Sequence, residues 1–345
     1  MTGNLLRRGI SRFLLAACLA APASSRAETV EGRWLLDFDR QDGRVQLTMK
    51  RTTSHGHWNS SSSYSLEDFR GLSLPKGNAP VAARFEMVRD AGTIRFEGQL
   101  DASGGSGRFQ FAANPDFESA WRARGYSSLS TDDAWAFTMH DVSRKFLDDL
   151  RSLGYDHLSA DSLVSMRIHG ATPEFIRDLK SLGYDHIPVD GLVSMRIHGA
   201  TPGFVRDLKS LGYEHVPVDD LVSMRIHGVS PEFIRDLKSL GYDHVPVDGL
   251  VSMRIHGATS EFVRDLKSLG YERVPVDDLV SMRIHGVSPD YVRQLQELGY
   301  RRVPVESLVS MRIHGVSVDY ARKMKERYRE VTVDELVNMR IHGNR

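Results

Sequence analysis

Residues 170–198 read GATPEFIRDLKSLGYDHIPVDGLVSMRIH, and residues 199–227 read GATPGFVRDLKSLGYEHVPVDDLVSMRIH. The pattern continues in both directions at a step of 29 residues. Its Gly-Tyr pair recurs at Gly125, Gly154, Gly183, Gly212, Gly241, Gly270 and Gly299, and its histidine at His140, His169, His198, His227, His256, His285 and His314, with His342 one residue short. A fixed period of roughly 20 to 50 residues is the signature of a repeat architecture. The sequence therefore predicts eight units over residues 112–342, of which the first and last are the most degenerate.

Each unit predicts two short helices. In the unit quoted first, Thr172 has N-cap chemistry, and Pro173 suits the first helical position because its missing N–H costs nothing there. The apolar side chains that follow share one face of a helix: Phe175, Ile176, Leu179 and Leu182. Gly183 is typical of the residue that follows a helix end.

The second helix is predicted to begin near Val189, to place Asp190 at its positive end and to stop before Gly199. We expect it to bury Leu192, Val193, Met195 and Ile197. The last unit supports this boundary, since Thr332 and Glu335 form the pattern of a capping box at the same place.

Helices of about ten residues are marginal in water by themselves. A single unit therefore has too little buried apolar surface to fold alone, and neighbouring units have to stack. The prediction for residues 112–343 is an α-solenoid of αα-hairpins.

Residues 28–111 have a different period, because apolar and polar residues alternate, as at Trp34, Leu36 and Phe38. Strict alternation between turn residues predicts an antiparallel β module with one covered face. Three polar or glycine-rich stretches are predicted to be loops: 59–63, 75–78 and 104–107. The predicted fold class is α+β, a small antiparallel β module followed by eight 29-residue αα-hairpins.

Residues 1–27 have the pattern of a secretory signal peptide. Arg7, Arg8 and Arg12 form a basic region, residues 13–21 an apolar region, and Ala27 suits the position before the cleavage site. An alternative is a lipid anchor at Cys18, which follows a lipobox-like Leu-Ala-Ala. Either interpretation predicts an exported, periplasmic or secreted protein.

One repeat segment resembles a known type. Residues 221–233, LVSMRIHGVSPEF, are similar to the "LxxLRIHGVTPEY" helical repeats of exported bacterial envelope proteins. Such repeats also occur at the C-terminal side of antirepressor-type membrane zinc peptidases of the β-lactam-sensor class. The resemblance covers residues 34–343 and includes the β segment with residues 95–98 and 107–111. It implies an extracytoplasmic sensing or interaction role without peptidase activity, since this chain contains no His-Glu-x-x-His motif.

Composition argues against several classes of partner. The chain has 45 basic and 45 acidic side chains, whereas proteins that bind nucleic acid usually carry a basic excess. The repeated Arg-Asp pair also hardly varies, so no residue pair could read successive bases. The apolar run 13–21 is shorter than the roughly 20 residues that cross a bilayer. We expect no nucleic-acid partner and no membrane span.

The recurrent histidines do not predict a metal site. Packed helices lie about 8–10 Å apart, whereas zinc holds its ligands at about 2.0–2.1 Å. One histidine per unit cannot cluster at that spacing, and we interpret these residues as favourable partners of helix C-termini. A second set, His157, His186, His215 and His244, gives way to Arg273 and Arg302 in later units. His55 and His57 are interpreted as surface residues.

No nucleophile elbow, P-loop or dinucleotide fingerprint is present in the sequence. We therefore expect no catalytic residue, no metal and no cofactor, and a non-catalytic interaction or sensor-accessory protein that binds a protein partner. The candidate partner-binding stripe consists of Arg177, Asp178, Lys180, Arg206, Asp207, Lys209, Arg235, Asp236 and Lys238. The alternatives are an envelope hydrolase or metal-binding protein that uses the β module, and a structural spacer.

Overall fold

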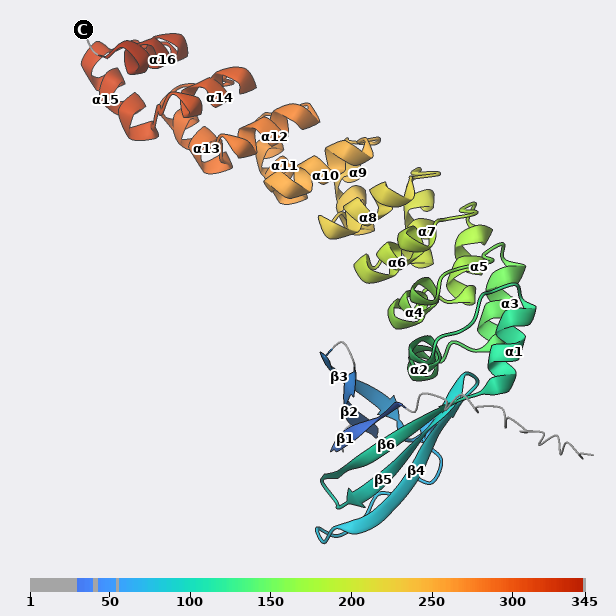
Figure 1. Ribbon diagram of the computed structural model, residues 1–345. Coiled ribbons are helices and arrows are strands. Elements are labelled where there is room, and N and C mark those ends of the chain that lie inside the picture. Colours follow the sequence, from blue (N-terminus) through green and yellow to red (C-terminus); the bar gives the residue numbers. More distant parts are fainter. Residues whose placement is uncertain (1–29, 40–42, 54–55, 344–345) are drawn as a thin grey trace, which may run out of the picture. The chain divides into compact units, whose positions relative to one another are not determined.

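The computed structural model describes residues 30–39, 43–53 and 56–343, so the predicted leader, Cys18 and His55 lie outside the described residues. Within them the fold is α+β, with a six-stranded antiparallel sheet followed by sixteen α-helices (Figure 1). The chain divides into two compact units. The sheet unit contains the described residues as far as Met87 together with Ile94–Ala112, and the helical unit contains Val88–Thr93 and the residues from Ala113 onward.

The sheet is ordered β3-β2-β1-β6-β5-β4. Its strands are β1 Val30–Asp39, β2 Arg44–Thr53, β3 Gly56–Ser65, β4 Val81–Arg89, β5 Gly92–Leu100 and β6 Gly104–Ala113, with a 3-10 turn at Leu66–Asp68. Alternate residues such as Trp34 and Leu36 are buried, so the predicted one-sided covering is confirmed. Trp34 lies in this core, and its indole N–H donates to the carbonyl of Arg108 at 3.0 Å.

The predicted loop at residues 59–63 is wrong, because these residues lie within β3. Asn59 lies opposite Lys50, and the following serines continue the antiparallel register with β2. Hydroxyl and amide hydrogen bonds take the place of apolar packing here, since Thr48 and Ser61 join their hydroxyls at 2.9 Å and Gln46 donates to Ser61 at 2.9 Å. A polar strand at the edge of the sheet is therefore held by its partner strand.

The predicted loop at residues 104–107 is also wrong, because β6 begins at Gly104. Its glycines allow a close approach between strands. A Cβ on Gly107 would lie 2.0 Å from the carbonyl oxygen of Glu97 on β5, and a Cβ on Gly98 of β5 would lie 2.7 Å from the Trp34 ring on β1. Glycine in a strand often marks such a close backbone approach. The predicted loop at 75–78 is confirmed, since no helix or strand includes it.

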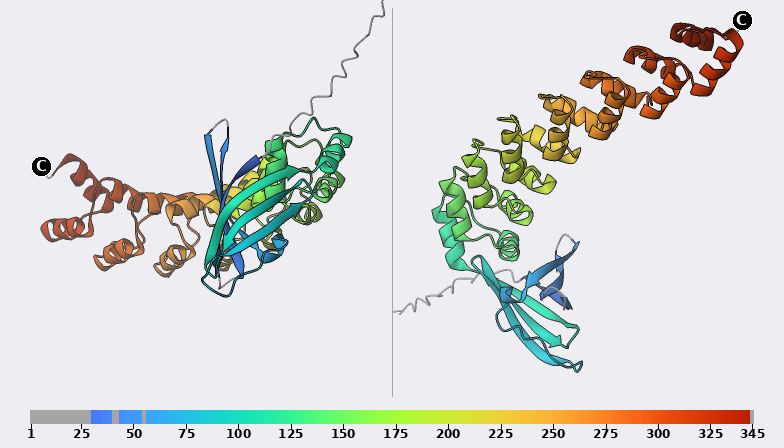
Figure 2. Two further views of the ribbon diagram at one scale, coloured as in Figure 1. Left: turned by 60° about the horizontal axis from the view of Figure 1, so that its bottom comes forward. Right: turned by 180° about the vertical axis from the view of Figure 1, so that it is seen from behind.

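The helices of the helical unit are nine to eleven residues long. They are α1 Pro115–Ala123, α2 Thr131–His140, α3 Arg144–Ser152, α4 Ala160–His169, α5 Pro173–Ser181, α6 Val189–His198, α7 Pro202–Ser210, α8 Val218–Ile226, α9 Pro231–Ser239, α10 Val247–His256, α11 Ser260–Ser268, α12 Val276–Ile284, α13 Pro289–Glu297, α14 Val305–Ile313, α15 Val318–Tyr328 and α16 Val333–His342. Each odd-numbered helix contacts the next odd-numbered one, and each even-numbered helix contacts the next even-numbered one. Figure 2 shows the resulting pairs of helices following one another.

The local signals at the helix ends are confirmed. The hydroxyl of Thr172 accepts a hydrogen bond from the Phe175 N–H at 3.3 Å. Gly199 caps α6 in the left-handed conformation at φ 72°. The capping box of α16 is present, because Glu335 accepts from the Thr332 N–H at 2.8 Å and donates its own N–H to the Thr332 hydroxyl at 3.3 Å.

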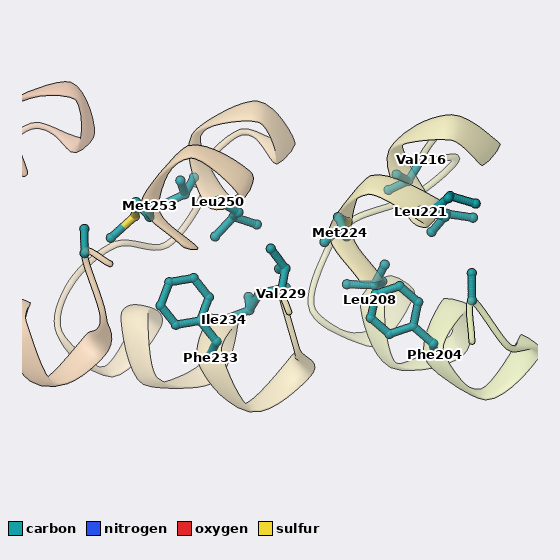
Figure 3. Packing of buried hydrophobic residues seen from close by; sticks show 14 of the residues in the cluster. Phe204, Leu208, Val216, Leu221, Met224, Val229, Phe233, Ile234, Leu250 and Met253 are labelled. Atoms are coloured by element: carbon teal, nitrogen blue, oxygen red, sulfur yellow. The ribbon is translucent and has the colours of Figure 1, made fainter. Parts of the chain in front are cut away.

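One apolar cluster runs through the helical unit. Phe204, Leu208 and Met224 of one helix pair belong to it together with Val229 and Phe233 of the next pair (Figure 3). These side chains are at most 6% exposed, so the interior between pairs is as well covered as the interior within a pair.

The predicted burial of Ile197 is wrong, since this side chain is 54% exposed. Leu192 and Met195 form the buried face of α6. Ile197 lies two residues beyond Met195, which places it about 200° around the helix axis. Val193 and Leu182 are only half-buried. The helix therefore has apolar side chains on two opposite faces.

Tyrosine hydroxyls connect each helix pair to the next. Tyr213 donates to the carbonyl of Val245 at 2.7 Å, and the same bond recurs with a separation of 32 residues. The equivalent pairs are Tyr155–Ile187, Tyr184–Val216, Tyr242–Val274 and Tyr271–Val303, at 2.7–2.8 Å. Burial raises the pKa of each of these tyrosines above its ordinary value.

Arginines make a second recurrent contact between pairs. The Nε of Arg196 on α6 donates to the carbonyl of His169 at the end of α4, at 3.3 Å, and its guanidinium lies 5.1 Å from the centre of the Phe175 ring on α5. The guanidinium–ring contact recurs at 5.0–5.3 Å in the pairs Arg167–Phe146, Arg225–Phe204, Arg254–Phe233, Arg283–Phe262, Arg312–Tyr291 and Arg340–Tyr320. One side chain of α6 thus contacts both α4 and α5.

The burial of these tyrosine hydroxyls predicts a loss of stability at alkaline pH. A folded-state pKa above the unfolded value means that the stabilisation is complete below about pH 10 and is lost as the pH rises through the folded pKa. At about pH 8, Tyr213→Phe should lower the free energy of unfolding by about 1 kcal/mol. The difference from the unmodified chain should shrink at about pH 11 in urea denaturation measured by circular dichroism.

Tyr328→Phe is the matched control, because Tyr328 is 40% exposed and lies near the end of α15. It should leave the free energy of unfolding unchanged at both pH values. A Tyr213→Phe difference that stays constant with pH would contradict the raised pKa of the buried Tyr213 hydroxyl.

Candidate functional site

The stripe proposed from the sequence lies on three consecutive odd-numbered helices, α5, α7 and α9, so the structure brings its residues together in one row. Two of its lysines are half-buried and take part in stacking. Lys209 donates to the carbonyl of Leu182 at 3.0 Å, and Lys238 donates to that of Leu211 at 2.6 Å. Each of these two lysines thus donates a hydrogen bond to a carbonyl group at the C-terminal end of the preceding odd-numbered helix, where no helical N–H is available.

Several other stripe residues pair within the helical unit. Arg177 lies 3.1 Å from Glu174 and 3.8 Å from Asp149, and Lys180 lies 3.3 Å from Asp185. Further along, Arg235 pairs with Glu232 at 3.2 Å, and Asp236 accepts from the Ser260 hydroxyl at 3.0 Å.

Arg206 differs from its equivalents, because Gly203 occupies the place of the glutamate that pairs with Arg177 and Arg235. In the described part of the chain it forms no ion pair, and it is exposed together with Asp178 and Asp207. Only part of the stripe, including Arg206, Asp178 and Asp207, is therefore available to a partner.

A second row lies on the even-numbered helices and was missed by the sequence analysis. Seven equivalent isoleucines, one near the C-terminal end of each even-numbered helix from α4 to α16, are 48–55% exposed. They are Ile168, Ile197, Ile226, Ile255, Ile284, Ile313 and Ile341. Because successive even-numbered helices contact one another, these side chains recur at equivalent places from helix to helix, and we call them the isoleucine row. Contiguous exposed apolar patches often mark interaction surfaces, so this row is a candidate surface for a partner.

The isoleucine row has acidic neighbours on the same face. Asp190, Val193 and Ile197 are three and four residues apart, so they follow one another along the outer face of α6. The equivalent acidic residues form a parallel row, which we call the acidic row: Asp161, Asp190, Asp219, Asp248, Asp277, Glu306 and Asp334. They are exposed, and among the described residues none forms an ion pair. In the first helical turn these carboxylates interact favourably with the positive end of the helix dipole, and they remain accessible to solvent.

The histidines lie where the sequence predicts, at the C-terminal ends of the even-numbered helices. His198 is the last residue of α6 and His227 is the C-cap of α8, and both are exposed beside the isoleucine row. His140, the last residue of α2, is half-buried instead. Burial, and to a smaller extent the charge of Arg167, lowers the pKa of its imidazole. The second histidine set lies in the connectors, where His186 is 3.1 Å from Asp185.

In residues 30–39, 43–53 and 56–343, no three His, Cys, Asp or Glu side chains lie close enough together to hold a metal ion. His55 lies outside these residues. The expectations of no metal, no cofactor and no catalytic residue stay predictions.

The spacing of apolar residues around the helix axis is the sequence signal that predicts the isoleucine row. Leu192 and Met195 are three residues apart and share a face, whereas Ile197 cannot share that face with them. A buried Ile197 would require all apolar residues of the helix to share one face, which its helical position does not allow.

Comparison with the models of known protein families gives no match, and no curated protein is found to be similar to the chain. Across the described residues, none of the helices combines the length and the apolar character needed to cross a membrane.

The isoleucine row predicts an unusual tolerance to polar substitution. Ile226→Thr should change the free energy of unfolding by no more than about 0.5 kcal/mol, because the side chain is 54% exposed. Met224→Ala, two residues away and fully buried, should cost about 2–5 kcal/mol. Chemical denaturation of the two variants measures both values, and a cost above about 2 kcal/mol for Ile226→Thr would place this side chain in the core instead.

Proposed function

We propose that the helical unit is an α-solenoid of eight αα-hairpins and that it serves an exported, non-catalytic protein as the surface for a protein partner. The observation that carries the proposal is the isoleucine row. Seven large apolar side chains are about half exposed at equivalent places on contacting helices. Solenoids characteristically bind through such extended surfaces of equivalent residues.

The acidic row indicates the chemistry of the partner. A bound segment that crosses the series of even-numbered helices would meet an isoleucine near the C-terminal end of each helix and a carboxylate near its N-terminal end. Asp190 and Ile197 are seven residues apart, which is about 10 Å along the helix. The proposed partner is therefore an extended or helical protein segment with apolar side chains for the isoleucine row and lysine or arginine side chains for the acidic row.

Repetition would give such a surface its affinity. Covering the exposed half of one isoleucine contributes on the order of 1 kcal/mol. Several equivalent contacts on one segment add in the manner of multivalent binding, so affinity should rise with the number of units engaged. Electrostatic complementarity with the acidic row would mainly speed association and select the partner.

Export and a sensor-accessory role remain part of the proposal. The leader pattern of residues 1–27 supports export, and the resemblance of residues 34–343 to envelope repeat proteins supports an extracytoplasmic role. The stripe around Arg206 on the odd-numbered helices remains the competing surface for the same function.

A defined peptide tests the surface. The probe is a fluorescent 20-residue peptide of alternating leucine and lysine, and fluorescence anisotropy measures its affinity for the purified chain. Changing Ile197, Ile226 and Ile255 together to Ser should weaken binding at least about tenfold. Arg206→Glu with Arg235→Glu, on the stripe, should change the affinity less than about twofold if the isoleucine row is the site.

Photo-crosslinking identifies the natural surface. A photoreactive amino acid at position 226 should capture a partner from envelope extract, and the same group at position 207 on the stripe should not. Capture only from position 207 would move the site to the stripe. Capture from neither position, together with equal peptide affinity for all variants, would contradict the proposed interaction function.

A further inference from the structure

Three cations lie side by side on the outer face of the sheet unit. Arg33 on β1 lies directly opposite Lys50 on β2 and directly opposite Arg108 on β6. All three side chains are exposed. We call them the basic row. Neighbouring strands are about 4.8 Å apart, so the basic row spans about 10 Å across three strands.

Such an arrangement is unfavourable without an anion. Like charges directly opposite one another destabilise a pair of strands. Other arginines of the sheet unit have acceptors: Arg95 pairs with Glu86 at 2.9 Å, and Arg44 donates to the Ser63 hydroxyl at 2.8 Å. Within the described residues, Arg33, Lys50 and Arg108 have neither an ion pair nor a side-chain hydrogen bond.

The basic row borders a groove. The groove has a volume of about 650 Å³, and its lining includes the basic row together with Glu31, Asn59 and Gln110. The volume is in the range of small-molecule sites. Among the described residues of its lining, Glu31 is the one acidic residue, against the three cations of the basic row. Arg51 and Trp58, which lie opposite each other on β2 and β3, also border the groove, and the Arg51 guanidinium lies 5.4 Å from the centre of the Trp58 ring.

We infer that this groove binds a small molecule with two or more linked phosphate groups. Guanidinium groups bind phosphate through two parallel hydrogen bonds, and an ammonium group adds a point charge. A single phosphate can reach two neighbouring cations, whereas linked phosphates can reach all three. The amide side chains of Asn59 and Gln110 supply further donors at the two sides. This inference concerns the sheet unit and is independent of the proposed partner surface on the helices.

Isothermal titration calorimetry of the full chain at constant ionic strength tests the inference with three probes: pyrophosphate, inorganic phosphate and citrate. Pyrophosphate should bind saturably, with one site per chain and at least tenfold more tightly than either of the other two. Its affinity should fall as salt is added. Absence of saturable pyrophosphate binding, or equal or tighter binding of citrate, would overturn the assignment.

Two variants of the basic row, Arg33→Gln and Lys50→Gln, locate the binding. Each should weaken pyrophosphate binding at least tenfold. Arg84→Gln is the matched control, because its side chain is 84% exposed on β4 of the same sheet and outside the groove. It should change the affinity less than twofold.

Melting temperatures of the variants without ligand distinguish a role of the basic row in ligand binding from a role in the stability of the fold. Removing one of three adjacent cations relieves repulsion, so Arg33→Gln should melt at the same or a higher temperature than the unmodified chain. Pyrophosphate should raise the melting temperature of the unmodified chain and of Arg84→Gln but not of Arg33→Gln. A lower melting temperature for both basic-row variants would show that the row is structural and would overturn the inference.

Discussion

The helices of this protein are too short to stand alone, and that constraint governs the rest of the helical unit. Helices of nine to eleven residues are marginal in water, so each depends on contacts with a neighbouring pair. The Tyr213 hydroxyl reaches 32 residues forward to Val245, and Lys238 reaches 27 residues back to Leu211. Arg196 joins the end of α4 to α5 and α6. The repeat length keeps these partners in register.

The same constraint separates the two faces of the helical unit. Stacking on the odd-numbered helices uses lysines such as Lys209, which is why a stripe with strong sequence periodicity is partly engaged within the fold. Stacking on the even-numbered helices uses Leu192 and Met195 and leaves Ile197 outside. A repeated residue can therefore serve folding or recognition, and sequence periodicity alone does not tell which.

Local chemistry was predictable from the sequence, and long-range geometry was only partly so. The Thr172 cap, the Gly199 stop and the Thr332–Glu335 capping box depend on neighbours within a few residues, and all three are confirmed. Residues 59–63 read as a loop because their place in β3 depends on a distant strand. Residues 104–107 read as a loop because the close approach of their glycines to β1 and β5 depends on strands that are distant in the sequence.

The candidate sites show the same limit. The outward position of Ile197 follows from helical geometry once Met195 is known to be buried, but its alignment with Ile226 depends on contact between α6 and α8. The basic row depends on strand register, since Arg33, Lys50 and Arg108 are far apart in the sequence and meet only through the pairing of β1 with β2 and β6. Without that register, the three residues read as ordinary surface charges.

The most direct test of nearest-neighbour stacking compares two deletions within the full chain. Removing residues 228–256 takes out one complete 29-residue period, so the Tyr and Arg contacts should re-form between the units on either side. Removing residues 228–238 takes out part of one helix pair and shifts every later partner out of register. Urea denaturation followed by circular dichroism should show that the longer deletion unfolds cooperatively and is the more stable of the two. Equal stability, or lower stability of the 29-residue deletion, would contradict the account.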